Sequence, residues 1–150
     1  MATQGTATVT VNATPEVVWS CVADITRHSE WSPKPYRVEL VSGEPNTVGS
    51  RYRSVGWAPP NDHNHVNDVE ITGVSPMTRF ALAGSDDSGT YTNTFDLRPV
   101  ADGTEVTYRI VFPEMKGLGA VLLPFLFPII AKPGINKRMR LLKQKVESVG

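Results

Sequence analysis

The sequence predicts an α+β domain in which an antiparallel sheet of short strands packs against helices from both ends of the chain. Three observations lead to this prediction. Between residues 36 and 112, segments of alternating apolar and polar residues are joined by short turns. A segment with helix-start signals precedes them, and apolar residues at helical spacing follow them. Since 150 residues is the length of one ordinary domain, we expect a single domain over residues 1–150.

The N-terminal part predicts one strand and one helix. Residues 6–11 place alternate side chains on one face, as a half-buried strand does. Thr14 is suited to cap a helix whose first residue is Pro15, where the missing N–H costs nothing. The apolar stripe of this helix is Val17, Val18, Cys21, Val22 and Ile25. We expect the prolines in 31–35 to end it, because a residue before proline avoids the helical conformation.

The middle of the chain predicts an antiparallel meander. Its alternating segments are residues 36–42, 50–57, 65–74, 78–84, 90–100 and 104–112. Parallel pairing needs long crossovers, and most of the turns here are too short for them. Asp102-Gly103 between two alternating segments is a strong signal for a hairpin.

Alternation also sorts the faces of the last two predicted strands. The residues that share one face are Tyr91, Asn93, Phe95 and Leu97 in the first, and Val106, Tyr108, Ile110 and Phe112 in the second. The opposite face carries threonines and charged residues. We therefore expect an apolar inner face with a few polar groups.

The C-terminal part predicts an amphipathic helix. Its apolar residues are Ile135, Met139, Leu142, Val146 and Val149. Residues 115–150 hold seven bases and one acid, whereas residues 57–114 hold nine acids and three bases. This asymmetry favours a solvated surface; the alternative is an anionic membrane surface or ligand that meets the helix. Nucleic acid is not expected as a partner, because no aromatic residues are interleaved with these bases.

The segment "GLGAVLLPFLFPIIAK", residues 117–132, has a long run without charge. A membrane-spanning helix needs about 20 apolar residues, and Pro124 and Pro128 would interrupt a helix here. Three roles remain: completing the core, covering a pocket as a gate, or docking on a bilayer together with the bases up to residue 145. Peripheral membrane contact through residues 117–145 is thus one expected partner interaction.

Composition places the chain among globular proteins of a reducing compartment. Net charge is zero, 40% of residues are hydrophobic and 20% are charged. The single Cys21 cannot form an internal disulfide, and the first residues lack the pattern of a secretory signal. We expect a cytoplasmic location.

Several stretches together resemble one known family. "ATPEVVWSCVADITRHSEWSP", "VGSRYR" and "ADGTEVTYRI" are similar, in this order, to recurrent pieces of the polyketide cyclase/dehydrase and lipid-transport families of the START-like superfamily. The resemblance implies the helix-grip fold, in which a curved antiparallel sheet wraps the last helix and leaves a hydrophobic cavity. It does not imply one chemistry, because the superfamily includes carriers, sensors and enzymes.

On this basis we expect a protein that binds a small hydrophobic or amphipathic molecule, lipid-like or polyketide-like, as a carrier or sensor. The candidate ligand-binding residues are Trp31, Tyr52, Trp57, His65, Phe80, Tyr91, Asn93, Phe95, Tyr108, Phe112, Leu122, Phe125 and Leu126. The alternative is a cyclase/dehydrase-type lyase or isomerase that uses Tyr91, Asn93 and Tyr108 for acid/base chemistry. A second alternative is a membrane-associated lipid carrier or a partner-binding module that uses residues 117–145. We favour binding, because the pattern assigns no carboxylate to the inner face.

Other chemistries find little support. His63 and His65 lie two residues apart, but zinc needs three or four ligands and none is adjacent, so no metal is expected. The pattern of a hydrolase nucleophile and that of a phosphate-binding loop are both missing. No cofactor is expected.

Overall fold

The computed structural model describes residues 4–34, 36–58, 62–87, 89–112 and 132–149. The strands are β1 (Gln4–Val11), β2 (Tyr36–Ser42), β3 (Arg51–Ala58), β4 (Asp62–Ser75), β5 (Arg79–Asp86), β6 (Gly89–Val100) and β7 (Gly103–Val111). The helices are α1 (Pro15–Val22), the 3-10 helix η1 (Ile25–Trp31) and α3 (Lys132–Val149). They follow one another in the predicted order.

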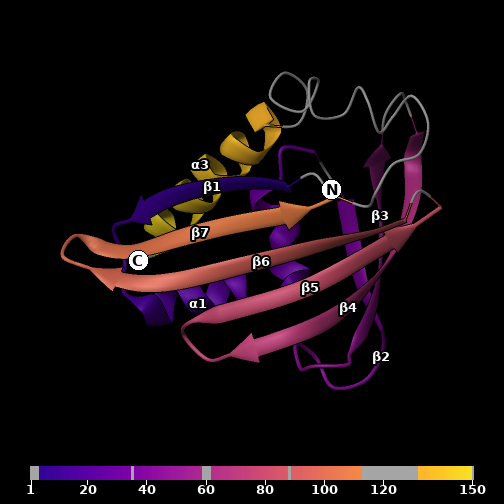
Figure 1. Cartoon of the computed structure of the whole chain (residues 1–150), viewed down its shortest axis with the longest axis horizontal. Helices are drawn as coiled ribbons and strands as arrows, with labels where there is room; N and C mark the ends of the chain where they lie inside the picture. The colour runs from indigo at the N-terminus through magenta and orange to yellow at the C-terminus, as the bar shows by residue number, and fades with distance from the viewer. Residues whose placement is uncertain (1–3, 35, 59–61, 88, 113–131, 150) are drawn as a thin grey trace.

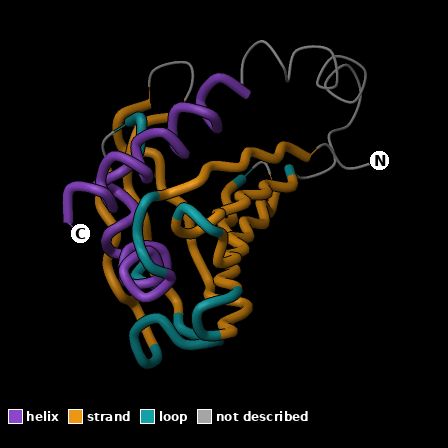
Figure 2. The backbone as a smooth tube through the Cα atoms, turned by 90° about the vertical axis from the view of Figure 1, so that its left-hand side faces the viewer, coloured by secondary structure: helices purple, strands orange, loops and turns teal. Residues whose placement is uncertain are grey.

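Within these residues the strands form one antiparallel sheet. Its order is β1-β7-β6-β5-β4-β3-β2, so each strand from β2 onward pairs with the next, and β1 pairs with β7 at the far edge. The sheet curves around α1 and α3, which lie together on its concave side (Figures 1 and 2). This is the helix-grip fold, and the predicted fold class is confirmed.

The N-terminal helical segment is broken into two pieces. Thr14 accepts a hydrogen bond from the backbone N–H of Val17 at 3.4 Å and starts α1 at Pro15, as predicted. The helix ends at Val22, so Ile25 enters the core from η1 and not from the stripe of the first helix. The carboxylate of Asp24 causes this break, since it accepts from the N–H of Thr26 at 3.1 Å and caps the new helix.

The β6–β7 hairpin differs from its prediction by one residue. Val100 pairs with Gly103, which leaves Ala101 and Asp102 as the turn residues. Gly103 follows the turn with a φ of 137°, a conformation that L side chains rarely adopt. A Cβ atom there would lie 2.0 Å from the carbonyl oxygen of Val11 on β1. Glycine therefore allows β1 and β7 to approach each other closely at this point.

Helix α3 is fixed along the edge strand β1. Four of its five predicted apolar residues are buried, while Val149, the last helical residue, is 54% exposed. Lys143 donates through Nζ to the carbonyl of Thr10 and to Glu147, both at 2.7 Å. Glu147 also accepts from the N–H of Asn12 at 2.8 Å. These bonds set the position of the helix over the sheet.

The basic character of α3 is partly used inside the fold. Besides Lys143, Lys145 forms an ion pair with Glu30 of η1 at 3.0 Å. No helix in the described ranges is long and apolar enough to cross a membrane. Residues 117–131 lie outside the described residues, so membrane contact through 117–145 stays a prediction.

The close approach at Gly103 predicts a large loss of stability for Gly103→Ala. The new Cβ combines an unfavourable φ with a clash against backbone, and we expect the free energy of unfolding to fall by about 3 kcal/mol or more. Urea denaturation of the purified variant measures this change.

Gly134→Ala is the matched control, because a Cβ atom at Gly134 of α3 meets nothing within 4 Å. Its free energy of unfolding should stay constant or rise by up to about 1 kcal/mol, since alanine favours helix. Equal stability of the two variants would contradict the role assigned to Gly103.

Candidate functional site

A cavity of about 390 Å³ lies between the concave face of the sheet, η1 and α3. Apolar side chains form much of its wall: Ile25, Val38, Val69, Leu82, Phe95 and Ile110. Strands β2 to β7 all contribute, because each turns alternate residues toward the helices. The glycines Gly56 and Gly84 also lie in the wall, and their missing side chains leave part of the space open.

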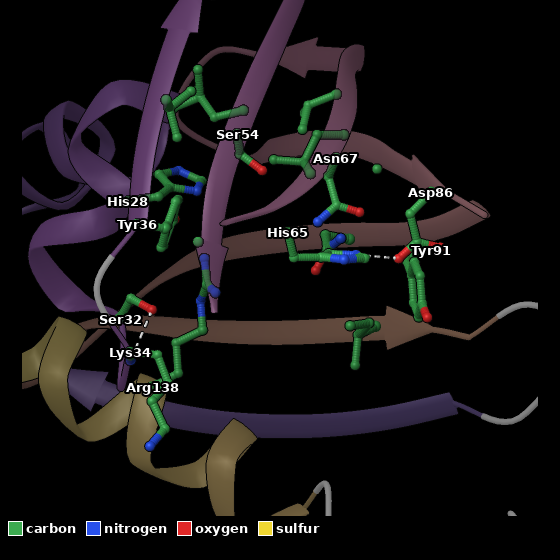
Figure 3. Close-up of a pocket in the computed structure, with 18 of the residues that line it drawn as sticks. His28, Ser32, Lys34, Tyr36, Ser54, His65, Asn67, Asp86, Tyr91 and Arg138 are labelled. Carbon is green, nitrogen blue, oxygen red and sulfur yellow. Dashed lines mark hydrogen bonds and ion pairs between the residues drawn. The ribbon is translucent and has the colours of Figure 1, made fainter. Parts of the chain in front are cut away.

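Polar side chains gather at two ends of this cavity (Figure 3). Ser32, Lys34 and Arg138 lie at the end next to α3. His65, Asp86 and Tyr91 lie at the other end, where β4, β5 and β6 run side by side (Figure 3). The cavity thus has a cationic end and an end with a histidine and a carboxylate, and between them lie apolar side chains and the polar groups of Ser54 and Asn67.

The end of the cavity opposite Arg138 holds a histidine–carboxylate pair. Nε2 of His65 lies 2.8 Å from Oδ2 of Asp86, and the side chains are 29% and 11% exposed. Because a carboxylate accepts and an imidazole N–H donates, Asp86 fixes the orientation of the His65 ring. A pair of this kind can accept and return a proton at neutral pH.

Tyr108 and Asn93 hold each other in the wall. The hydroxyl of Tyr108 donates a short hydrogen bond to Oδ1 of Asn93. The ring of Tyr108 stacks on Phe95 at 4.7 Å between centroids. Burial raises the pKa of Tyr108, although the charge of Arg138 opposes this effect. The hydroxyl therefore stays protonated at neutral pH and acts as a donor rather than as a base.

His28 of η1 is a neutral histidine on the wall. Its Nε2 lies 2.7 Å from the carbonyl oxygen of Val22, which can only accept, so the hydrogen resides on Nε2. Burial, and after it the nearby charge of Arg138, lowers the pKa of His28 to about 3. The ring contributes packing and a hydrogen bond between η1 and α1, but no charge.

Arg138 reaches the cavity from α3. Its guanidinium carbon lies 4.8 Å from the ring centroid of Trp31 and 5.6 Å from that of Tyr108. Both aromatic rings attract a cation through their faces. Within the described residues, its Nε is buried and has no hydrogen-bond partner.

The structure brings five of the candidate residues together around this cavity: His65, Tyr91, Asn93, Phe95 and Tyr108. All three candidate catalytic residues are among them. The strands carry them to the same face because the predicted alternation of β6 and β7 is correct, with Phe95 opposite Tyr108 and Asn93 opposite Ile110.

Other candidates lie elsewhere in the described structure. Trp31 and Phe80 are buried in the core. Their ring centroids lie 4.6 and 5.9 Å from that of His28. Tyr52 is buried, and its hydroxyl accepts from the N–H of Asn46 at 2.7 Å, which fastens the turn before β3. Phe112 packs its ring against the edge of Tyr91 outside the cavity wall. These positions suit packing more than ligand contact.

Four candidates cannot be placed. Leu122, Phe125 and Leu126 lie outside the described residues, as does the side chain of Trp57 in β3. His63 is also outside the description of side chains. Among the described residues, no three His, Cys, Asp or Glu side chains lie close enough to hold a metal ion.

Sequence reasoning missed three residues that define the chemistry of the cavity: His28, Asp86 and Arg138. Arg138 lies three residues after Ile135 and four before Leu142, so helical spacing could have placed it beside the buried stripe of the last helix. Asp86 ends a strand in which Phe80, Leu82 and Gly84 share its face, so extending the alternation by one step would have found it. His28 gave no such signal.

The neutral state of His28 predicts a pH-dependent stability. The folded pKa of about 3 is below the unfolded value of 6.5, so the unfolded chain takes up the proton first as the pH falls. His28 then removes about 1.4 kcal/mol of stability per pH unit between pH 6.5 and 3. His28→Gln does not titrate there and should lose less stability on acidification.

Urea denaturation of both proteins at pH 7 and pH 4.5 measures the effect. We expect the gap between the two pH values to be larger in the wild type by about 2–3 kcal/mol. Parallel losses in the two proteins would show that His28 is already charged in the fold or is not buried.

Comparison with known structures supports the fold. TTHA0849 from Thermus thermophilus superposes with a TM-score of 0.76 at 18% identity, over 99% of both chains. CV1439 from Chromobacterium violaceum superposes with a TM-score of 0.67 at 18% identity, over 96% of this chain and 97% of that one. DynU16, from the dynemicin biosynthetic locus, gives 0.65 at 20% identity, over 97% of this chain and 48% of its own length.

None of the curated proteins matches the chain in sequence. The family model described as polyketide cyclase / dehydrase and lipid transport does match, over residues 2–147. The match covers nearly the whole chain and agrees with the fold and with the sequence motifs. The chain therefore belongs to the polyketide cyclase/dehydrase and lipid transport family.

Proposed function

We propose that this protein binds a small amphipathic molecule, lipid-like or polyketide-like, in the cavity between the sheet and α3, as a carrier or sensor. The observation that carries the proposal is the cavity itself, of about 390 Å³, with apolar and polar side chains along its wall and charged groups at its two ends. Small-molecule pockets commonly enclose about 300 to 1,000 Å³ and have this composition. Family membership agrees with such a role.

The apolar and the polar side chains of the cavity contribute to binding in different ways. Side chains such as Val69, Leu82 and Ile110 remove apolar surface of the ligand from water, which contributes about 25 cal/mol per Å². The polar groups at the two ends orient the ligand, because an unmatched polar group in the cavity is unfavourable. A ligand with an apolar middle and at least one polar end fits this arrangement.

Filling the cavity from Gly84 tests the binding role. A Cβ at Gly84 meets nothing within 4 Å, and Gly84 lies in the wall, so the side chain of Gly84→Ile extends into the ligand space. We expect at least tenfold weaker binding of the neutral fluorescent probe N-phenyl-1-naphthylamine. The melting temperature should not fall, since isoleucine favours strand conformation.

Gly84→Ala is the matched control and should bind the probe nearly as the wild type does. Native mass spectrometry of freshly purified wild type, followed by solvent extraction, would identify a co-purified ligand, which the Gly84→Ile protein should lack. Equal probe affinity of wild type and Gly84→Ile, or no affinity in any of the three proteins, would refute binding in this cavity.

A second candidate function is a cyclase-type reaction, favoured by the His65–Asp86 pair at the cavity end. In this proposal the imidazole of His65 takes a proton from a carbon next to a carbonyl group of the substrate. The carbanion forms a C–C bond to a second carbonyl carbon of the same molecule, and the resulting alkoxide takes the proton back from His65. Asn93 lines the same space, and because its Oδ1 accepts from Tyr108, its amide N–H groups can donate to a carbonyl oxygen.

The probe 1-(2-acetylphenyl)propan-2-one tests this candidate, because its intramolecular aldol reaction and loss of water give the fluorescent product 3-methyl-1-naphthol. If His65 is the base, His65→Gln should lower the rate about 100-fold or more, while the probe still binds. Tyr91→Phe reports separately on the hydroxyl of Tyr91. A wild type no faster than buffer would eliminate the enzyme candidate and leave the binding role.

A further inference from the structure

Arg138 stands apart from the other charged groups of the cavity. Its Nε is buried, and within the described residues it has neither a hydrogen-bond partner nor an ion pair. Two lysines on the same helix do have carboxylate partners, Lys143 with Glu147 and Lys145 with Glu30. A guanidinium carries five N–H donors and no acceptor, so it can be satisfied only by an acceptor from elsewhere.

The groups around Arg138 do not supply that acceptor. Trp31 and Tyr108 present ring faces to it, at 4.8 and 5.6 Å, and these attract the cation without accepting its hydrogen bonds along the edge. Among the described residues, Asp86 is the one carboxylate in the cavity wall, and it pairs with His65 at the opposite end. Among the residues that the structure describes, none supplies a counter-charge to Arg138 inside the cavity.

A second buried donor in the same stack lacks a partner as well. Within the described residues, Nε1 of Trp31 has no hydrogen-bond partner, and the ring of Trp31 lies directly against the guanidinium. A buried donor without an acceptor is unfavourable and is rare in folded proteins. Two of them in one contact indicate a place where the described residues supply no acceptor.

We infer that Arg138 binds a carboxylate group of the ligand, so that the cavity selects small aromatic or aliphatic acids over neutral molecules of the same shape. The inference rests on the proposed binding function and names the class of its ligand. A guanidinium that contacts aromatic rings with its face leaves its edge of N–H donors for another group, and a carboxylate matches that edge with two parallel hydrogen bonds.

The polarity of the cavity then fixes the orientation of the acid. Its carboxylate lies at the α3 end with Arg138, next to the neutral His28. Its apolar body extends between Leu82 and Ile110 toward the end that holds His65 and Asp86. The reverse orientation would place the carboxylate beside the carboxylate of Asp86, which is electrostatically unfavourable.

The test compares 2-naphthoate with 2-naphthamide, which have the same shape and differ in charge. Isothermal titration calorimetry at pH 7 gives both dissociation constants for wild type, Arg138→Met and Arg140→Met. We expect wild type to prefer 2-naphthoate by about tenfold to hundredfold, as for a hydrogen bond to a charged group. Arg138→Met should bind the two probes equally, mainly through weaker binding of 2-naphthoate.

Arg140→Met is the matched control, because Arg140 lies on the exposed side of the same helix and should keep the full preference. The inference would be overturned if wild type did not prefer 2-naphthoate, or if Arg138→Met showed the same preference as wild type. In either case, binding of 2-naphthamide by wild type would still support the proposed binding function. Failure of wild type to bind either probe would overturn both. The ratio of the two dissociation constants of wild type is measured without any variant. The inference can therefore be tested even if Arg138→Met does not fold.

Discussion

The packing of Phe95 on the inner face of the sheet separates the core of this protein from its cavity. The ring is fully buried, stacks on Tyr108 at 4.7 Å and meets the edges of Trp31 and His28 at 5.6 and 5.4 Å. On one side of it, Leu97 continues a close-packed core; on the other, Asn93 faces open space. The helices cover the first part of the sheet closely and leave a cavity over the second part.

His28 shows how the boundary between core and cavity is kept stable. A charged imidazole would be unfavourable beside Arg138 in this apolar surrounding, and the low pKa of His28 keeps the ring neutral. Its hydrogen bond to Val22 joins the end of α1 to η1. The same short segment thus supplies a wall of the cavity and a link between the two helices.

Neither the family nor the fold determines which ligand or reaction the protein has, and the side chains in the cavity restrict the possibilities. The similar structures share 20% identity or less with this chain, which supports the fold alone. Two polar ends, one with Arg138 and one with His65 and Asp86, distinguish this cavity from a plain apolar pocket. A carrier needs a group that orients its ligand, and Arg138 at one end suits this role. An enzyme needs a group that transfers a proton, and His65 at the other end suits that role.

The sequence by itself determined the fold class, the order of the elements and the inward face of the last strands. Alternation with a period of two is a local property, so Tyr91, Asn93, Phe95 and Tyr108 could be assigned to the inner face without a structure. The pattern does not say how far the helices extend over that face. For this reason it could not separate these residues from Trp31, Tyr52 and Phe80, which are also buried but belong to the core.

Only the tertiary structure decided which charged groups enter the cavity. Helical spacing places Arg138 beside the buried stripe of α3. Its contact with Trp31 depends on how α3 lies over the sheet, which the bonds of Lys143 and Glu147 to the end of β1 determine. Asp86 meets His65 because antiparallel pairing brings β4 and β5 together across 21 residues of chain. Both contacts join segments far apart in sequence, and no local pattern contains them.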